Sequence, residues 1–144
     1  MNDNDKWATA SLRIWSEERQ KIEEISALLG AVPSRSHEKG DPISQRFPSR
    51  GVRRNSVWIL VSEAPPESDL ATHLKWIVDF VETKAGAMAL LPETCKADLV
   101  CAFSSGNGQG GTILDSGLLE RIARLGLDLT IDLFPPEPIS LSEE

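Results

Sequence analysis

The chain opens with a segment in which apolar and polar side chains alternate. Between residues 8 and 15 every even-numbered position is apolar, whereas most odd-numbered positions are polar. A period of two is typical of a β-strand with one face in the core and the other at the surface. The same period recurs later, where Asp128, Thr130 and Asp132 alternate with aliphatic residues. The two patterns predict a first and a last strand, each with one polar face.

Two other segments are apolar at nearly every position. They are residues 57–61 and 99–103, and such runs are typical of strands in the middle of a sheet. A further short strand is expected near residues 35–39, inside a longer segment, residues 31–56, that is rich in Pro, Gly, Ser and Arg. A loop of that length is uncommon in a compact domain and usually has a function or is mobile.

Apolar residues at a period near 3.6 predict three helices. Ser16 is the expected N-cap of the first helix, and Gly30 can adopt the left-handed conformation that ends it. The second helix follows Ser68 or Asp69 and has the most regular apolar stripe, which Gly86 is expected to bend or break.

A third helix is expected from a cap at Asp115 or Ser116 to a stop at Gly126. The order of elements is then βαββαβαβ. Because strand and helix patterns mix without strict alternation, we expect an α+β fold. The predicted architecture is a two-layer sandwich, with a mainly antiparallel sheet of about five strands and helices on one face.

Length and composition fit one globular domain. The chain has 144 residues, of which 40% are hydrophobic and 26% charged. We predict a single domain over residues 1–144, with its core at about residues 8–134 and an acidic, Pro-containing tail at residues 135–144. No apolar run approaches the roughly 20 residues of a membrane helix. Because the first residues also lack a signal-peptide pattern, we expect a cytoplasmic protein with no membrane partner.

The charge is unevenly distributed. Residues 33–56 carry six Lys or Arg and two acidic residues, a local charge of +4, which leaves −11 for the rest of a chain whose net charge is −7. The net acidity disfavours nucleic acid as a partner, because phosphate binding depends on clustered Lys and Arg. The arginines of this basic segment either bind an anionic partner or lie along the acidic remainder of the protein itself.

Residues 106–111, Gly-Asn-Gly-Gln-Gly-Gly, fit the GxGxxG pattern that holds a dinucleotide pyrophosphate. A strand precedes them, a helix follows, and Asp132 stands 21 positions beyond Gly111, which favours that function. Against it, only one strand remains to build a nucleotide crevice, and residues 112–114 intervene before the helix cap. We therefore interpret the glycines as a flexible connection and expect no cofactor.

Several short segments, in this order, resemble a known family. They are Ala-Ser-Leu-Arg-Ile at residues 10–14, Ser-Val-Trp-Ile-Leu at 56–60, Gly-Gly-Thr-Ile-Leu at 110–114 and Leu-Gly-Leu-Asp-Leu at 125–129, followed by Asp132. Together they resemble the bacterial family catalogued as domain of unknown function 4279, over roughly residues 8–134. The resemblance implies a small bacterial α+β domain and brings no known catalytic residues. Related small domains occur near toxin and immunity loci, which suggests protein binding. Phe134 stands where the resemblance leads us to expect Tyr.

Side chains that could carry catalysis or hold a metal form no known motif. His37, His73, Cys95 and Cys101 are scattered, without HxxxH or CxxC spacing, so we expect no metal site. No serine stands in a GxSxG elbow, and no Cys is paired with a His, so we expect no enzyme. His73 lies off the main apolar stripe of its helix and is expected at the surface or its boundary. The two cysteines are expected to be buried, reduced thiols.

The polar side of the predicted sheet is the best candidate binding surface. Charged and aromatic side chains are expected to meet there and in the basic segment. The candidates are Arg13, Trp15, Trp58, Asp98, Asp128 and Asp132 on the sheet, with Arg53 and Arg54 in the basic segment. Trp and Arg dominate many protein interfaces. A solvated sheet face of similar polarity is nevertheless ordinary in antiparallel sheets, and Arg13 would then only offset the neighbouring aspartates.

We therefore expect a non-enzymatic bacterial binding module with a protein partner, such as an immunity-type protein, whose net acidity would suit a basic toxin. The alternative is a domain that responds to a small anion or nucleotide held by the basic segment, residues 33–56. RNA binding on the sheet would need paired stacking aromatics, for which Phe103 alone is weak support.

Overall fold

The computed structural model describes residues 6–105 and 110–134 and contains a five-stranded sheet. The strands are β1 (Lys6–Ser16), β2 (Arg35–His37), β3 (Ser56–Val61), β4 (Cys95–Ser105) and β5 (Asp128–Phe134). Their order across the sheet is β2-β3-β1-β4-β5, and all neighbours are antiparallel except β4 and β5, which are parallel. The predicted five-stranded, mainly antiparallel sheet is confirmed.

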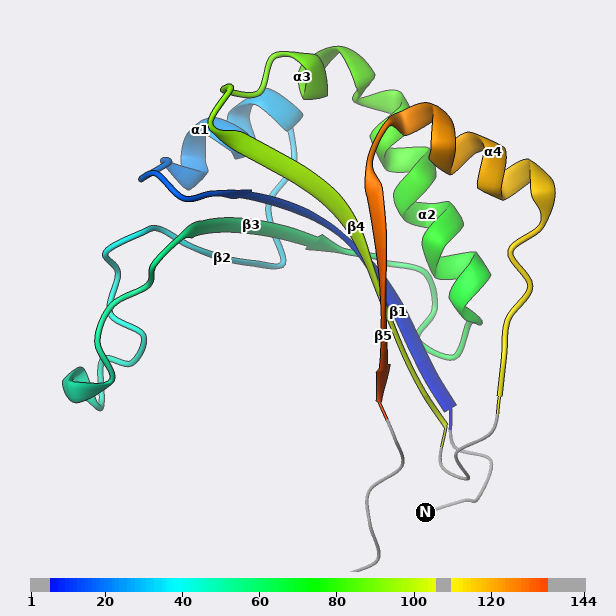
Figure 1. The fold of residues 1–144 in the computed structure, drawn as a ribbon, viewed down its shortest axis with the longest axis horizontal. Helices are drawn as coiled ribbons and strands as arrows, with labels where there is room; N and C mark the ends of the chain where they lie inside the picture. Colours follow the sequence, from blue (N-terminus) through cyan, green and yellow to red (C-terminus); the bar gives the residue numbers. More distant parts are fainter. Residues whose placement is uncertain (1–5, 106–109, 135–144) are drawn as a thin grey trace, which may run out of the picture.

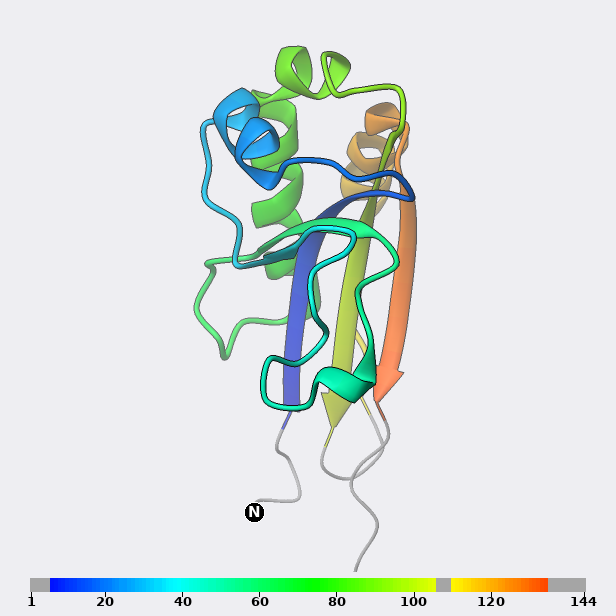
Figure 2. The ribbon, with the colours of Figure 1, turned by 90° about the vertical axis from the view of Figure 1, so that its left-hand side faces the viewer.

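The helices all lie on the same side of this sheet (Figure 1). They are α1 (Ile22–Leu29), α2 (Leu70–Thr83), α3 (Ala85–Ala89) and α4 (Ser116–Leu125). The strands bend, so that the side away from the helices is concave (Figure 1). Figure 2 looks onto this side of the sheet. We call this uncovered side the open face. The two-layer arrangement with helices on one face is therefore confirmed.

The core lies between the helices and the inward side of the three central strands. Leu12 and Ile14 of β1, Trp58 of β3, Leu99 of β4 and Leu74 of α2 are fully buried there. On β1 the inward residues are the even-numbered ones, as the alternation predicts. The hydrophobic effect of burying these large side chains is the main stabilising contribution to the two-layer arrangement.

Side-chain caps and glycines set the ends of the helices. Asp69 accepts a hydrogen bond from the backbone N–H of Thr72 at 2.9 Å, and Asp115 accepts one from Leu118 at 2.8 Å. These carboxylates satisfy backbone donors that no earlier turn can pair. Gly126 ends α4 in the left-handed conformation, with φ of 70°, as Gly30 ends α1. Both predicted stops are confirmed.

Two predicted helix boundaries are wrong. Ser16 ends β1 instead of capping α1, and its hydroxyl accepts from the N–H of Glu18 in a tight turn. The helix begins at Ile22, whose N–H donates to a carboxylate oxygen of Glu38, so a distant acidic residue replaces the predicted local cap. Farther on, the break after α2 falls at Lys84, and Gly86 lies inside α3.

The basic segment forms a hairpin arm that sequence periodicity did not reveal. Residues 38–55, which we call the arm, continue the β2–β3 pair outward through an antiparallel bridge between Pro42 and Val52. The N–H of Ile43 donates to the carbonyl of Gly51 at 3.0 Å. In Figure 1 the arm bends away from the helices, along one flank of the open face. The predicted long loop is therefore largely a paired hairpin.

Candidate functional site

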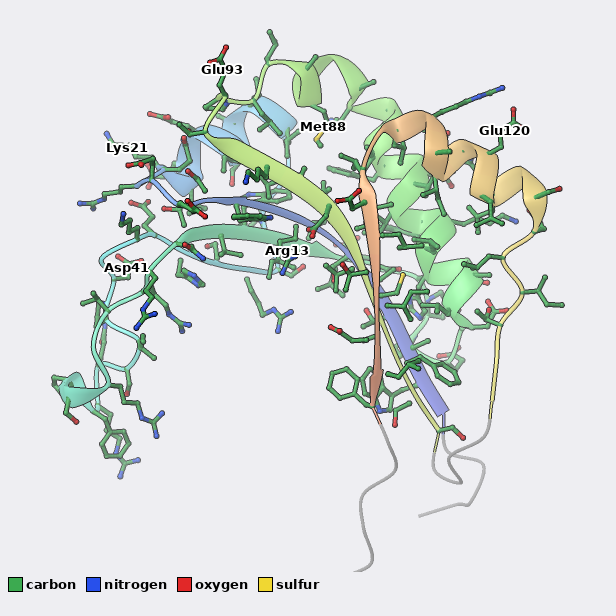
Figure 3. The ribbon with its side chains drawn as sticks, viewed as in Figure 1. Arg13, Lys21, Asp41, Met88, Glu93 and Glu120 are labelled. Carbon is green, nitrogen blue, oxygen red and sulfur yellow. The ribbon has the colours of Figure 1, made fainter. Side chains whose placement is uncertain are left out.

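Strand register places the side chains of the open face in rows across the sheet. The central row contains Arg35 of β2, Ile59 of β3, Arg13 of β1, Asp98 of β4 and Asp128 of β5. Its charge therefore changes from basic at the arm to acidic at β5. In Figure 3, Arg13 lies on the open side of the sheet, whereas Met88 and Glu120 lie on the helix side.

The middle of this row is an ion pair with two hydrogen bonds. Nε of Arg13 donates to Oδ1 of Asp98 at 2.9 Å, and Nη2 donates to Oδ2 at 2.5 Å. The hydrogen bonds to Asp98 raise the pKa of Arg13, partial burial opposes them, and the charges of Asp98 and Asp132 add to the rise. Arg13 and Asp98 therefore neutralise each other in place, which leaves the ends of the row to carry the net charge.

The acidic end of the open face is on the edge strand. Asp128 and Asp132 are exposed on β5, and neither forms an ion pair or a side-chain hydrogen bond with another described residue. Near the start of β1 and the end of β5, the ring centres of Trp7 and Phe134 lie 5.3 Å apart, and each side chain is about half exposed. The aromatic pair adds apolar surface beside the acidic strand. Sequence reasoning did not single out Trp7, although an aromatic at an odd position of the alternating first strand was a usable signal.

Of the two tryptophans predicted for the open face, only Trp15 lies on it. Trp15 is half-buried, and the ammonium of Lys96 lies 5.1 Å from the centre of its ring. Trp58 instead pairs in register with the inward-facing Ile14 and is fully buried. Its Nε1–H donates to the hydroxyl of Ser26 at 3.0 Å, so the indole has its partner inside the protein. The prediction that Trp58 belongs to the binding surface is therefore wrong.

The outer half of the arm exposes an arginine–aromatic cluster. The guanidinium carbons of Arg46 and Arg50 lie 5.3 and 5.2 Å from the ring centre of Phe47, which is 47% exposed. Such contacts place positive charge against the negative face of the ring. Ile43 and Val52 are also exposed on the arm. The cluster combines cationic and apolar groups on one protruding surface.

None of the five arginines in β2 and the arm forms an ion pair with the residues that the structure describes. They are Arg35, Arg46, Arg50, Arg53 and Arg54. The acidic groups near the base of the arm are otherwise engaged: Glu38 pairs with Arg19, and Asp41 accepts from the N–H of Glu38 at 2.7 Å. These five arginines are therefore not paired with the protein's own described acidic groups.

Hydrogen bonds to a buried serine hold the base of the arm in place. The hydroxyl of Ser56, which is 1% exposed, accepts from the backbone N–H groups of Gln20 and Lys39 at 2.9 and 3.0 Å. The ammonium of Lys39 donates to the carbonyl of Glu17. The arm is thus attached to the segment between β1 and α1 as well as to β3.

A cavity of about 350 Å³ lies where the arm meets the sheet. Its lining residues are Arg35, Ser36, His37, Arg53, Val57 and Ile59. Burial lowers the pKa of His37, the charge of Arg53 lowers it further, and Asp41 partly opposes both. Arg53 was a predicted site residue, but Arg35 and His37 were not. Arg54 is exposed and does not line the cavity.

The structure pairs a serine and a histidine that are 11 positions apart in the sequence. Nδ1 of His73 forms a 2.9 Å hydrogen bond with the hydroxyl of Ser62. The same hydroxyl oxygen accepts from the N–H of Ala64. His73 is 2% exposed, so its predicted place at the surface or its boundary is wrong. Its Nε2 is buried without a partner among the described residues. Because the imidazole is enclosed in the core, we interpret the pair as a structural link between α2 and the segment after β3.

The glycine-rich segment lies partly outside the described residues, which exclude positions 106–109. Gly110 and Gly111 are exposed and precede α4 by several residues. At the N-terminus of that helix, the backbone N–H of Leu118 already donates to the carboxylate of Asp115. In a dinucleotide-binding loop the pyrophosphate would hold that position. The geometry of the described part therefore differs from the nucleotide motif.

Other described features add no second candidate of equal strength. A largely apolar cavity of about 460 Å³ lies between α3, the ends of α2 and α4, and β4. Cys101 is buried and Cys95 half-buried, and both are free thiols, whose pKa values burial raises, to about 11 for Cys101. Within residues 6–105 and 110–134, no group of three or more His, Cys, Asp or Glu is arranged to hold a metal. No described helix is long and apolar enough to cross a membrane.

The fold and surface together define a two-layer α+β domain with an open, charged sheet face and a basic hairpin arm. Within that class, the chain belongs to the family described as "Domain of unknown function (DUF4279)", whose model matches residues 5–135. The match covers nearly the whole chain and confirms the family resemblance noted in the sequence. No curated protein and no solved structure shows significant similarity to the chain.

Proposed function

We propose that this protein is a non-enzymatic binding module that holds another protein between its arm and its open sheet face. The supporting observation is the set of arginines in β2 and the arm that form no ion pair with described residues, beside the exposed apolar surface of Phe47, Ile43 and Val52. Arginine is enriched in binding hot spots, and arginine and aromatic residues, phenylalanine included, are enriched at protein interfaces. A protruding arm that exposes both types is suited to a protein partner.

The distribution of charge indicates how such a partner would be oriented. The arm is basic, whereas Asp128 and Asp132 make the opposite edge of the open face acidic. A partner with acidic groups toward the arm and basic groups toward β5 would be attracted in one orientation and repelled in the reverse one. The net charge of −7 favours a basic partner overall, as in an immunity-type protein that neutralises a toxin.

Capture of partners from the source organism tests this proposal. Tagged protein is incubated with cell extract at low and at moderate salt, and the specific partner is identified. The arm variant Arg46→Gln/Arg50→Gln removes the two arginines that flank Phe47. Lys75→Gln/Arg124→Gln is the matched control, because it removes the same charge from exposed residues of the helix layer.

We expect the wild type and the control to capture the same partner and the arm variant to lose it, with weaker capture at the higher salt. Recovery of no specific partner at either salt would contradict the proposal. So would equal capture by the arm variant, because binding would then use another surface.

A further inference from the structure

The cavity at the base of the arm has two arginine side chains and no acidic one among its lining residues. Arg35 and Arg53 both line it, none of its six lining residues is acidic, and neither arginine forms an ion pair with a described residue. Two guanidinium groups beside one small cavity repel each other unless an anion lies between them. We propose that this cavity is an oxyanion site, which binds a phosphate or carboxylate group through Arg35 and Arg53.

The backbone fixes both arginines before any ligand is bound. Arg35 belongs to β2 and pairs in register with Ile59 of β3. Arg53 donates its N–H to the carbonyl of Asp41 at 2.7 Å and accepts from the N–H of Gly40 at 3.0 Å. Binding therefore costs mainly the freedom of the two side chains, which favours affinity.

The chemistry of the lining suits an oxyanion better than an uncharged ligand. A guanidinium donates parallel hydrogen bonds that match phosphate and carboxylate oxygens, and such charge-assisted bonds are stronger than neutral ones. Val57 and Ile59 supply an apolar floor from the sheet. The volume of about 350 Å³ lies in the range of small-ligand pockets, so it can admit the anionic group and part of the molecule that carries it.

His37 makes the site observable. Arg35 lies on the same strand as His37. Burial and the charge of Arg53 lower the pKa of His37, and the charge of Asp41 raises it. A bound anion would counteract the charge of Arg53 and so raise the pKa of His37. By linkage, the protonated ring then favours the anion, and affinity increases as the pH falls through the titration of His37. The only other histidine of the chain, His73, is buried in the core and serves as an internal reference.

The experiment follows the two histidine rings by NMR while inorganic phosphate is added to the full chain at constant ionic strength. We expect the His37 signals to shift along a saturable curve and its pKa to rise, whereas the His73 signals stay in place. A parallel titration with acetate separates the two sources of the oxyanion. Saturation by phosphate alone assigns a free phosphate compound, and saturation by acetate as well assigns a carboxylate, including an acidic side chain of a protein partner.

Two matched variants show whether phosphate binding depends on this cavity or only on the positive charge of the arm. Arg53→Gln removes a guanidinium that lines the cavity, whereas Arg54→Gln removes the same charge from the next residue, outside it. We expect Arg53→Gln to weaken phosphate binding about tenfold or more, as the loss of charge-assisted hydrogen bonds implies. Arg54→Gln should weaken it less than about twofold, because an exposed charge outside the cavity is screened.

Two outcomes would overturn the inference. One is a His37 signal that responds to neither phosphate nor acetate, and the other is an equal loss of binding in the two variants. Backbone amide spectra of both variants establish that they are folded. The outcome is independent of the proposed protein partner, because capture is tested with Arg46 and Arg50, which do not line the cavity.

Discussion

The two faces of the sheet are built from the same strands but differ in burial. On the covered face, Leu12, Trp58 and Leu99 are fully buried against the helices. On the open face, neighbouring positions of those strands carry partly exposed groups such as Arg13 and Trp15. Burial of apolar surface stabilises the fold, whereas exposed ion pairs contribute little. The comparison predicts that side chains of the open face, where we propose that a partner binds, can be changed with little loss of stability.

The largest difference in stability between the two faces is expected when Trp58 and Trp15 are each replaced by alanine. Trp58→Ala should lower the free energy of unfolding by about 3–5 kcal/mol, because it leaves a cavity in the core and removes the donor to Ser26. Trp15→Ala, the matched change on the open face, should cost about 1 kcal/mol or less, as is usual for partly exposed positions. Urea unfolding of both variants measures the difference. Equal losses would show that the two faces do not differ in this way.

Removal of the buried hydroxyl of Ser56, where the arm joins the sheet, should have the next largest effect on stability. Ser56→Ala removes the acceptor of two backbone N–H groups, that of Gln20, which is buried, and that of Lys39, which is partly buried. The cost of unsatisfied buried donors predicts a loss of about 2–3 kcal/mol in unfolding free energy. Ser49→Ala, at an exposed position of the arm, is the control and should change stability by less than about 0.5 kcal/mol. A small effect of Ser56→Ala would mean that water replaces the hydroxyl.

The residues of the covered face could be predicted where the apolar positions followed one clear period along the chain. Alternation in residues 8–15 identified the inward side of β1, and the caps Asp69 and Asp115 identified the starts of two helices. The segment containing Trp58 is apolar at every position, so its sequence does not indicate which side faces the helices. Only the register with β1, a non-local property, decides that Trp58 points inward.

The open face could be predicted only in part, for a related reason. Arg13, Asp98 and Asp128 lie in one row, as their polar positions in strand patterns suggested. The arm was missed because backbone hydrogen bonds between Pro- and Gly-containing segments leave no hydrophobic period. Arg35 and His37 are two positions apart in the short strand predicted near residues 35–39. They could have been found if the pairing of that strand with the predicted strand at residues 57–61 had been recognised.

Removal of the N-cap of α2, in the helix layer, should have a smaller effect on stability, and that effect should depend on pH. The hydrogen bonds from Thr72 lower the pKa of Asp69 below its ordinary value of 3.8. A carboxylate whose pKa is lower in the folded state stabilises the fold above its ordinary value, and that contribution is lost as the pH falls through the lowered one. Asp69→Ala should therefore cost about 1 kcal/mol near neutral pH, the usual value of an N-cap, and progressively less on acidification. Unfolding curves of both proteins across this range test the sign, and a cost that grows on acidification would contradict the assignment.

The smallest effect is expected from the ion pair at the centre of the open face. A double-mutant cycle with Arg13→Gln and Asp98→Asn should give a coupling free energy of about 1 kcal/mol or less, because the Arg13 side chain is 39% exposed and solvent screens the pair. The two hydrogen bonds between the side chains favour the upper end of that range. Urea unfolding at low and high salt measures the coupling, which should decrease with added salt. A coupling well above this value that persists at high salt would mean that the open face helps to hold the sheet together, and the separation between a stabilising face and a binding face would then fail at its centre.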